Sequence, residues 1–148
     1  MSGTCDDTTY RRLIEQVADA VIYADTGGAI RIWNAAAERL FGFSAAEAIG
    51  RSLDLIIPER LRAAHWQAFD AALACGATKL GGKATLTRAQ TRDGGTVYVD
   101  MSFSLLTDEQ GAVLGSMAVA RDATARRDEL AALRARIAAL EKAAPTTG

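Results

Sequence analysis

Residues 56–76 have the sequence IIPERLRAAHWQAFDAALACG and contain the only histidine of the 148-residue chain. Pro58 suits the first turn of a helix, where its missing N–H costs nothing, and Gly76 suits the left-handed residue just past a helix end. The two residues predict one long helix over residues 58–75. Apolar residues recur along it every three or four positions, and His65 falls on the face that they form. The imidazole is therefore expected to point inward, either as a hydrogen-bonded core residue or as a ligand of iron or zinc.

Two runs of β-branched and aromatic residues precede the long helix and predict a β-hairpin. They are residues 20–25 (AVIYAD) and 29–34 (AIRIWN), and the Thr-Gly-Gly between them supplies residues that tolerate positive φ. Trp33 has the opposite parity to the two isoleucines of its run, so we expect its ring on the outer face of the sheet. Residues 35–41 and 44–50 then predict two short helices that end at glycines, the second beginning with the pattern of a capping box.

Three strands joined by two turns follow the long helix. They are predicted over residues 79–90, 96–106 and 112–121, separated by Asp- and Gly-rich turns. The middle strand has its larger apolar side chains at odd positions, which we expect to face inward. The last strand is apolar on both faces, which implies a second covering element or a partner chain. Together the elements predict an α+β fold: a five-stranded antiparallel sheet with short helices and one long helix over one face, and a pocket between the layers.

Both ends of the chain are expected to be helical. Residues 8–18 predict an N-terminal cap helix that begins at Thr8 or Thr9. Residues 123–142 predict a C-terminal helix whose apolar residues have the spacing of a coiled-coil seam between two copies: Leu130, Leu133, Ile137 and Leu140. Only two heptads are formed, so the alternative is an amphipathic helix that packs back on its own domain. The expected organisation is a disordered tail (1–7), the cap helix (8–18), the core (19–122), the dimerisation helix (123–142) and a second tail (143–148).

Composition narrows the classes of function. Seventeen Lys and Arg residues against eighteen Asp and Glu residues give a net charge of −1, without a basic cluster, so no direct contact with nucleic acid is expected. No apolar run approaches the ~18 residues of a membrane span and the N-terminus lacks the apolar core of a signal peptide, so we expect a cytoplasmic protein. Cys5 and Cys75 are expected to be free thiols. No catalytic set is visible, so we do not expect an enzyme.

Several motifs accompany this order of elements. They are NAAAERLFGF (34–43), EAIG (47–50), Pro58 at the start of the long helix, RDG (92–94) and RDAT (121–124). Together, and in this order over residues 13–127, they resemble the PAS domain family of sensor modules. The resemblance implies a domain that senses a small ligand, redox state, gas or light, dimerises through flanking helices, and passes its signal to an effector protein. It also implies that Asp122 and Thr124 couple the last strand to the C-terminal helix.

Within this family, the sequence is similar to the haem-binding PAS domains of oxygen-sensing histidine kinases, in which the long helix carries the iron-ligating histidine. The resemblance implies haem b as cofactor, with His65 as the proximal iron ligand and Met101 as a candidate distal ligand. The implied binding residues are His65, Phe69, Leu80, Thr85, Met101, Phe103 and Ala118. Thr85 departs from the oxygen sensors, which have there an arginine that hydrogen-bonds the bound gas. Trp66 should lie about 100° around the helix from His65, at a rim or interface.

Two alternatives to a haem sensor of gas or redox state stay open. The first is a PAS domain without a cofactor that binds a small organic molecule or acts only in dimerisation and protein interaction. The second is a haem enzyme, which is disfavoured because no acid or base accompanies His65 in the sequence.

Overall fold

One five-stranded antiparallel sheet forms the centre of the structure. The computed structural model describes residues 3–78 and 81–144. The strands lie in the order β2-β1-β5-β4-β3. They are β1 (Ala20–Asp25), β2 (Ile30–Trp33), β3 (Thr85–Gln90), β4 (Thr96–Thr107) and β5 (Val113–Asp122). The helices are α1 (Asp7–Gln16), α2 (Ala35–Phe41), α3 (Ala45–Ala48), the 3₁₀ helix η1 (Leu53–Ile56), α4 (Glu59–Cys75) and α5 (Thr124–Ala143). The predicted α+β fold is confirmed.

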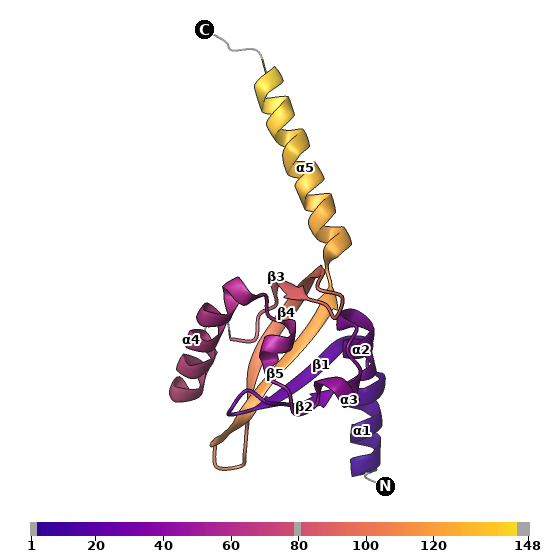
Figure 1. Ribbon diagram of the computed structural model, residues 1–148, viewed down its shortest axis with the longest axis vertical. Coiled ribbons are helices and arrows are strands. Elements are labelled where there is room, and N and C mark those ends of the chain that lie inside the picture. Colours follow the sequence, from indigo (N-terminus) through magenta and orange to yellow (C-terminus); the bar gives the residue numbers. More distant parts are fainter. Residues whose placement is uncertain (1–2, 79–80, 145–148) are drawn as a thin grey trace.

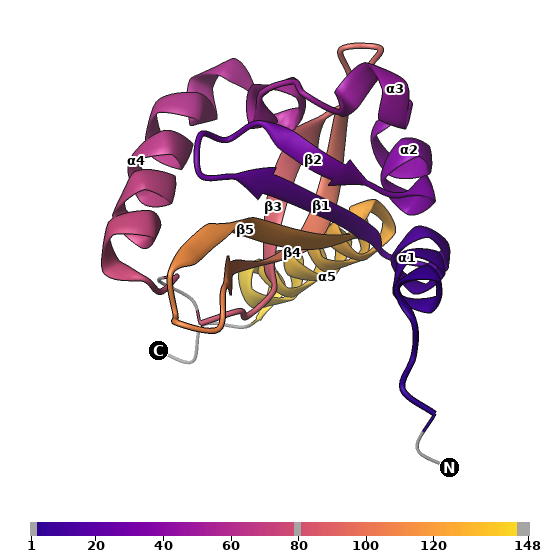
Figure 2. The ribbon, with the colours of Figure 1, turned by 90° about the horizontal axis from the view of Figure 1, so that it is seen from below.

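Helices α2, α3 and α4 pack against one face of the sheet. In Figure 2, α4 lies at one side of the strands and α2 and α3 at the other. The core between these layers includes Ile22, Ile30, Phe41 and Val99, all fully buried. Strand β5 contributes only small side chains to this inner face, at Ser116, Ala118 and Ala120. The side chains on the inner face of the sheet are therefore smallest along its middle strand, β5.

A β-bulge in the first hairpin reverses the predicted orientation of Trp33. The register of β2 against β1 shifts at Arg31, which has no partner on β1, so Ile30 and Trp33 face the same side. Trp33 is 3% exposed and packs against Phe41 and Phe43. Its indole Nε1 donates a hydrogen bond to the Phe43 carbonyl at 2.9 Å. The prediction of an outer-face ring was wrong, because it assumed unbroken alternation along the strand.

Asn34 joins three elements through one buried amide. Its Oδ1 accepts hydrogen bonds from the backbone N–H of Ala37, which caps α2, and from that of Val21 on β1, at 3.0 and 2.9 Å. Its Nδ2 donates to the carbonyls of Ile14 on α1 and Asp19, at 2.9 and 3.0 Å. A buried amide with all four partners fixes the relative positions of the elements that it joins.

Several element boundaries differ from those predicted, and local residues explain two of them. Helix α1 begins after Asp6, whose carboxylate accepts a hydrogen bond from the Thr9 N–H at 2.8 Å, so the cap is Asp6 and neither Thr8 nor Thr9. Strand β3 begins at Thr85, although the strand was predicted from residue 79. Gly81 and Gly82 both have positive φ, a conformation that ends strand pairing there.

Helix α5 extends away from the sheet, as Figure 1 shows. None of its described residues is buried, so the alternative of a helix packed back on its own domain is wrong. No helix in the described part of the chain is both long and apolar enough to cross a membrane.

Candidate functional site

A cavity of about 190 Å³ lies between α4 and the strands β3 and β4. Five of the predicted binding residues line it: His65, Phe69, Thr85, Met101 and Phe103. Its remaining lining residues are Ala68, Ala72, Thr78 and Lys83, which sequence reasoning did not single out. Ala118 does not line this cavity and is buried in the core of the sheet. Leu80 lies outside the described residues.

His65 stands among aromatic rings at one wall of this cavity. Its ring centroid is 4.9 Å from that of Trp66, 6.0 Å from Phe69 and 6.5 Å from Phe103. Its Nδ1 atom is buried, and no group in the described part of the chain forms a hydrogen bond with it. Burial lowers the pKa of His65 below its ordinary value of 6.5, and the Asp54 carboxylate offsets only part of this effect. The imidazole is therefore neutral at pH 7 and has a lone pair available for a metal ion or a hydrogen-bond donor.

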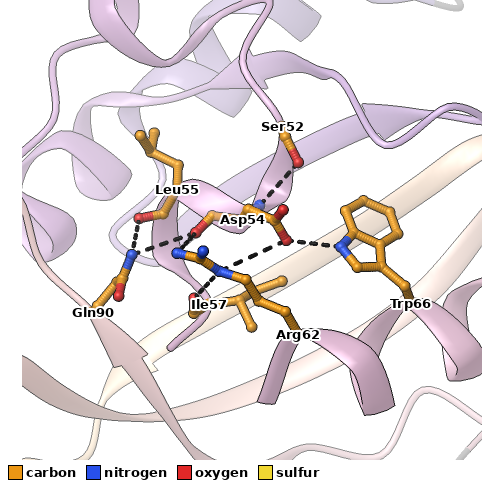
Figure 3. A network of polar contacts seen from close by, with 7 residues as sticks. All are labelled: Ser52, Asp54, Leu55, Ile57, Arg62, Trp66 and Gln90. Carbon is orange, nitrogen blue, oxygen red and sulfur yellow. Dashed lines mark hydrogen bonds and ion pairs between the residues drawn. The ribbon is translucent and has the colours of Figure 1, made fainter. Parts of the chain in front are cut away.

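Trp66 fastens α4 to the elements beside it. Its indole Nε1 donates a hydrogen bond to Oδ1 of Asp54 on η1 at 2.7 Å, as Figure 3 shows. Its ring also covers Gly28 in the β1–β2 turn, where an added Cβ would lie 2.2 Å from the indole. Gly28 has φ +82°, so the turn and the close approach both require glycine. Sequence reasoning placed Trp66 at a rim and missed this contact, because the partner residues are distant in sequence.

Residues 54–57 also accept hydrogen bonds from side chains of α4 and β3 (Figure 3). Arg62 Nε donates to the Ile57 carbonyl at 3.0 Å and lies 4.0 Å from the Asp54 carboxylate. Gln90 Nε2 on β3 donates to the carbonyl of Leu55 at 3.1 Å and to that of Asp54 at 3.4 Å. The segment η1 is thus the point at which α4, β3 and the first hairpin meet.

The joint between β5 and α5 is bonded to β4 at one residue. The Asp122 carboxylate accepts a hydrogen bond from the Thr124 N–H at 2.9 Å. The Thr124 hydroxyl accepts from the Tyr98 N–H at 3.3 Å, and the Tyr98 carbonyl accepts from the Ala123 N–H at 2.7 Å. The two residues predicted to couple the last strand to the C-terminal helix therefore lie in one bonded cluster.

Side chains of β4 extend this cluster to the first turn of α5. The Arg127 guanidinium lies over the Tyr98 ring, 4.4 Å from its centroid, and Arg126 forms an ion pair with Asp100. Tyr98 and Asp100 alternate along β4 with Met101 and the other inward residues. Strand β4 therefore contacts the cavity with one face and helix α5 with the other.

Within residues 3–78 and 81–144, no three His, Cys, Asp or Glu side chains come together in a group that could hold a metal ion. His65 accordingly offers one protein donor at the cavity, and Met101 a second, weaker one.

Comparisons with known proteins agree with this architecture. The family model of the PAS fold matches residues 8–123. Sensor protein FixL of Bradyrhizobium diazoefficiens is 41% identical over 59 residues, which are 40% of this chain and 12% of FixL. Oxygen sensor protein DosP of Escherichia coli is 27% identical over 111 residues, which are 75% of this chain and 14% of DosP. The chain thus spans about an eighth of the length of these relatives.

A solved structure extends the likeness to the helices at the ends. An RNA-binding light-oxygen-voltage receptor superposes with a TM-score of 0.72 at 25% identity, covering 96% of this chain and 41% of the receptor. The family predicted from the motifs is confirmed, and the similarity to two sensor proteins supports the narrower resemblance. The chain belongs to the PAS fold family and is similar to a part of one sensor protein and a part of one oxygen sensor protein.

Proposed function

We propose that this domain senses a gas or redox state through haem b held in the α4–β4 cavity, with His65 as the iron ligand. The observation that carries the proposal is the buried Nδ1 of a neutral imidazole, without a hydrogen-bond partner among the described residues, at a largely apolar cavity. A buried polar atom without a partner is uncommon, and one at a cavity marks a place where a ligand can supply the partner.

The donor chemistry of the site fits haem. A porphyrin supplies four nitrogen donors of its own, so one imidazole from the protein is sufficient, and the bound iron can take up gases or change oxidation state. Met101 lines the same cavity and is the candidate for the second axial position. The side chains of Ser116, Ala118 and Ala120 on β5 are small and project little from the inner face of the sheet, which favours a flat ligand beside them. Because Thr85 replaces an arginine, oxygen would be bound differently here than in the oxygen-sensing kinases.

The size of the cavity favours a second candidate, a small organic ligand. Pockets that enclose drug-sized ligands measure about 300–1,000 Å³, and this one measures about 190 Å³. A small, largely apolar molecule with one hydrogen-bond donor for His65 would fill it as it stands. Haem would require α4 to lie further from β4, and α4 has only Phe69 and Ala72 buried.

The signal would pass from the cavity through β4 to α5. A ligand that displaces Met101 or Phe103 moves the strand whose other face holds Arg126 and Arg127. We propose that the α5 helices of two copies pair through Leu130, Leu133, Ile137 and Leu140. The pair would shift between two packings, and an effector protein would detect the shift. The apolar outer face of the sheet would add to this homodimer.

Haemin titration followed by visible absorption tests the cofactor. A sharp Soret band at one haem per chain is expected for the parent protein and for Gln67→Ala, a neighbouring surface variant. The band should be lost or strongly weakened in His65→Ala, and Met101→Leu should change the spectrum without abolishing binding. Absence of a band in the parent protein would reject haem and leave the organic-ligand candidate, which thermal-shift screening of small apolar compounds would then test. Sedimentation of Ile137→Asp against the parent protein tests pairing through α5.

A further inference from the structure

A groove of about 440 Å³ lies on the outer side of the sheet, near the point where α5 leaves it (Figure 1). It runs between the first part of α5 and the strands β3 and β4, and the start of α4 adjoins it. Its lining residues include three arginines and three leucines: Arg88, Arg127, Arg134, Leu61, Leu86 and Leu130. The groove shares no residue with the α4–β4 cavity, so it is a separate site.

The positive charge of this groove is poorly neutralised within the chain. No Asp or Glu is among its described lining residues. Arg88 and Arg134 form no ion pair in the described part of the chain, and Arg127 reaches only the carboxylate of Asp128, the next residue, at 3.1 Å. A guanidinium group binds a carboxylate through two parallel hydrogen bonds, so the groove favours carboxylates supplied from outside the chain.

The ring of Tyr98 positions two of these guanidinium groups. Tyr98 lies opposite Arg88 in the β3–β4 ladder, and the guanidinium carbon of Arg88 is 6.0 Å from the ring centroid. The guanidinium carbon of Arg127 is 4.4 Å from the same centroid. A guanidinium stacked on an aromatic face keeps its N–H donors available for another partner. An incoming carboxylate would therefore meet charges that are already placed, which lowers the entropy cost of binding.

Apolar side chains lie beside the charges and leave the groove open. Leu86 and Leu130 are 42% and 39% exposed, and Leu61 is partly buried. Sites for small molecules usually enclose most of their ligand, whereas an open groove of mixed charged and apolar surface suits a segment of another protein. A nucleic-acid backbone would pair with the arginines and leave the leucines without a contact.

The groove uses a face of α5 that the proposed pairing of two copies leaves accessible. Arg127, Ala131 and Arg134 are spaced by four and three residues, so they form one stripe along the helix. At 3.6 residues per turn, this stripe lies about 100° around α5 from the middle of the four apolar residues of the proposed seam. Arg127 and Arg134 are seven residues apart, which places them roughly 10.5 Å apart along the helix axis.

We infer that this groove binds an acidic, amphipathic segment of a partner protein, whose carboxylates pair with the three arginines and whose apolar side chains contact the leucines. A helix with glutamates seven residues apart and leucines between them matches the charge spacing along α5. Such a segment touches α5 and the sheet at once, so its affinity depends on how the two are placed. By reciprocity, a ligand that moves β4 changes the affinity for the partner. The inference does not depend on which ligand fills the cavity.

Fluorescence anisotropy with a labelled helical peptide of this design tests the inference on the full-length chain. The parent should bind it, and should not bind a peptide with lysine in place of each glutamate. Arg88→Glu and Arg134→Glu should each weaken binding about tenfold, and Leu86→Ser about threefold. Arg39→Glu on α2 and Arg136→Glu on the far side of α5 are matched controls and should bind as the parent does.

All five replaced side chains are exposed, so each variant is expected to fold. Equal weakening in the four arginine variants would show an effect of net charge alone and would overturn the inference. Absence of peptide binding by the parent would overturn it as well.

Two further measurements distinguish other occupants of the groove. A labelled single-stranded oligonucleotide should not bind, and binding that is lost in Arg134→Glu would make the groove a nucleic-acid site instead. In sedimentation equilibrium, the double variant Arg88→Glu/Arg134→Glu should self-associate as the parent does, and a loss of self-association would mean that a second copy occupies the groove. Neither measurement involves the cavity, so a missing Soret band would reject haem and leave this inference standing.

Discussion

Trp66 on α4 donates its indole N–H to the carboxylate of Asp54 on η1 at 2.7 Å, one position after the histidine that lines the cavity. The bond ties the cavity-forming helix to the segment that also receives Gln90 from β3. The position of His65 relative to the sheet is therefore set by its neighbour, because His65 itself forms no hydrogen bond through its buried nitrogen.

Replacing Trp66 by Phe should lower the free energy of unfolding by about 1 kcal/mol, because the Asp54 carboxylate loses a donor but remains partly in contact with water. Urea denaturation at pH 7 measures the change. Gln67→Ala on the same helix is the control and should stay within about 0.5 kcal/mol of the parent. A Trp66→Phe protein as stable as the parent would show that the bond does not hold the helix.

Gly28→Ala should be strongly destabilising, by about 2–4 kcal/mol, because it adds a Cβ 2.2 Å from the indole at a positive φ. Part of this cost is steric and part is backbone strain. In a Trp66→Ala background only the strain remains, so the cost of Gly28→Ala should fall by at least about 1 kcal/mol. Equal costs in both backgrounds would mean that the turn moves away from the helix without difficulty.

The stability of the domain should fall as the pH drops from about 7 to about 5. Since burial lowers the folded-state pKa of His65 below 6.5, the unfolded chain binds more protons than the folded chain in this window. The stabilisation is complete above pH 6.5 and is lost below it.

Urea midpoints measured at intervals from pH 5 to pH 8 should decline less in His65→Phe than in the parent. Hydrogen bonds lower the pKa values of Asp25 and Glu47, so these carboxylates also lose stabilisation as the pH falls; both proteins contain them, and the difference between the two pH curves therefore reports on His65. Parallel pH curves for the two proteins would contradict the prediction.

The Thr124 hydroxyl should control how firmly α5 is attached to the sheet. Thr124→Val removes the acceptor for the Tyr98 N–H while keeping the shape of the side chain, and Thr124→Ser keeps the acceptor. Hydrogen exchange at the Tyr98 amide and in the first turn of α5 should accelerate about five- to tenfold in Thr124→Val. Thr124→Ser should exchange at the parent rate. Identical rates in both variants would remove the hydroxyl from the joint.

The elements that the sequence predicts well are those with local signals. Gly76 does end the long helix in a left-handed conformation, and the short helix at residues 45–48 has the predicted capping box. Asp122 and Thr124 form the joint expected from the RDAT motif. In each case the residues that determine the structure are neighbours in the chain.

The features that sequence reasoning missed depend on contacts between distant residues. The bulge at Arg31 turns Trp33 inward. No sequence signal within residues 29–34 predicts that one residue of β2 lacks a partner on β1. The contact between Trp66 and Gly28 joins residues 38 positions apart, so neither the helix pattern nor the turn pattern could reveal it. The cavity likewise includes Lys83 and Thr78 from the segment before β3, whose path no periodicity describes.

Odd and even residues of β4 face opposite sides of the sheet, so substitutions in this strand have two different kinds of effect. A substitution at an odd position, such as Met101, can retune what the domain recognises and leave its output contacts intact, whereas one at an even position, such as Tyr98 or Asp100, does the reverse. Inserting or deleting a single residue in this strand would exchange the two sets and disable recognition and output together. The length of β4 should therefore be far less tolerant of change during divergence or engineering than its composition.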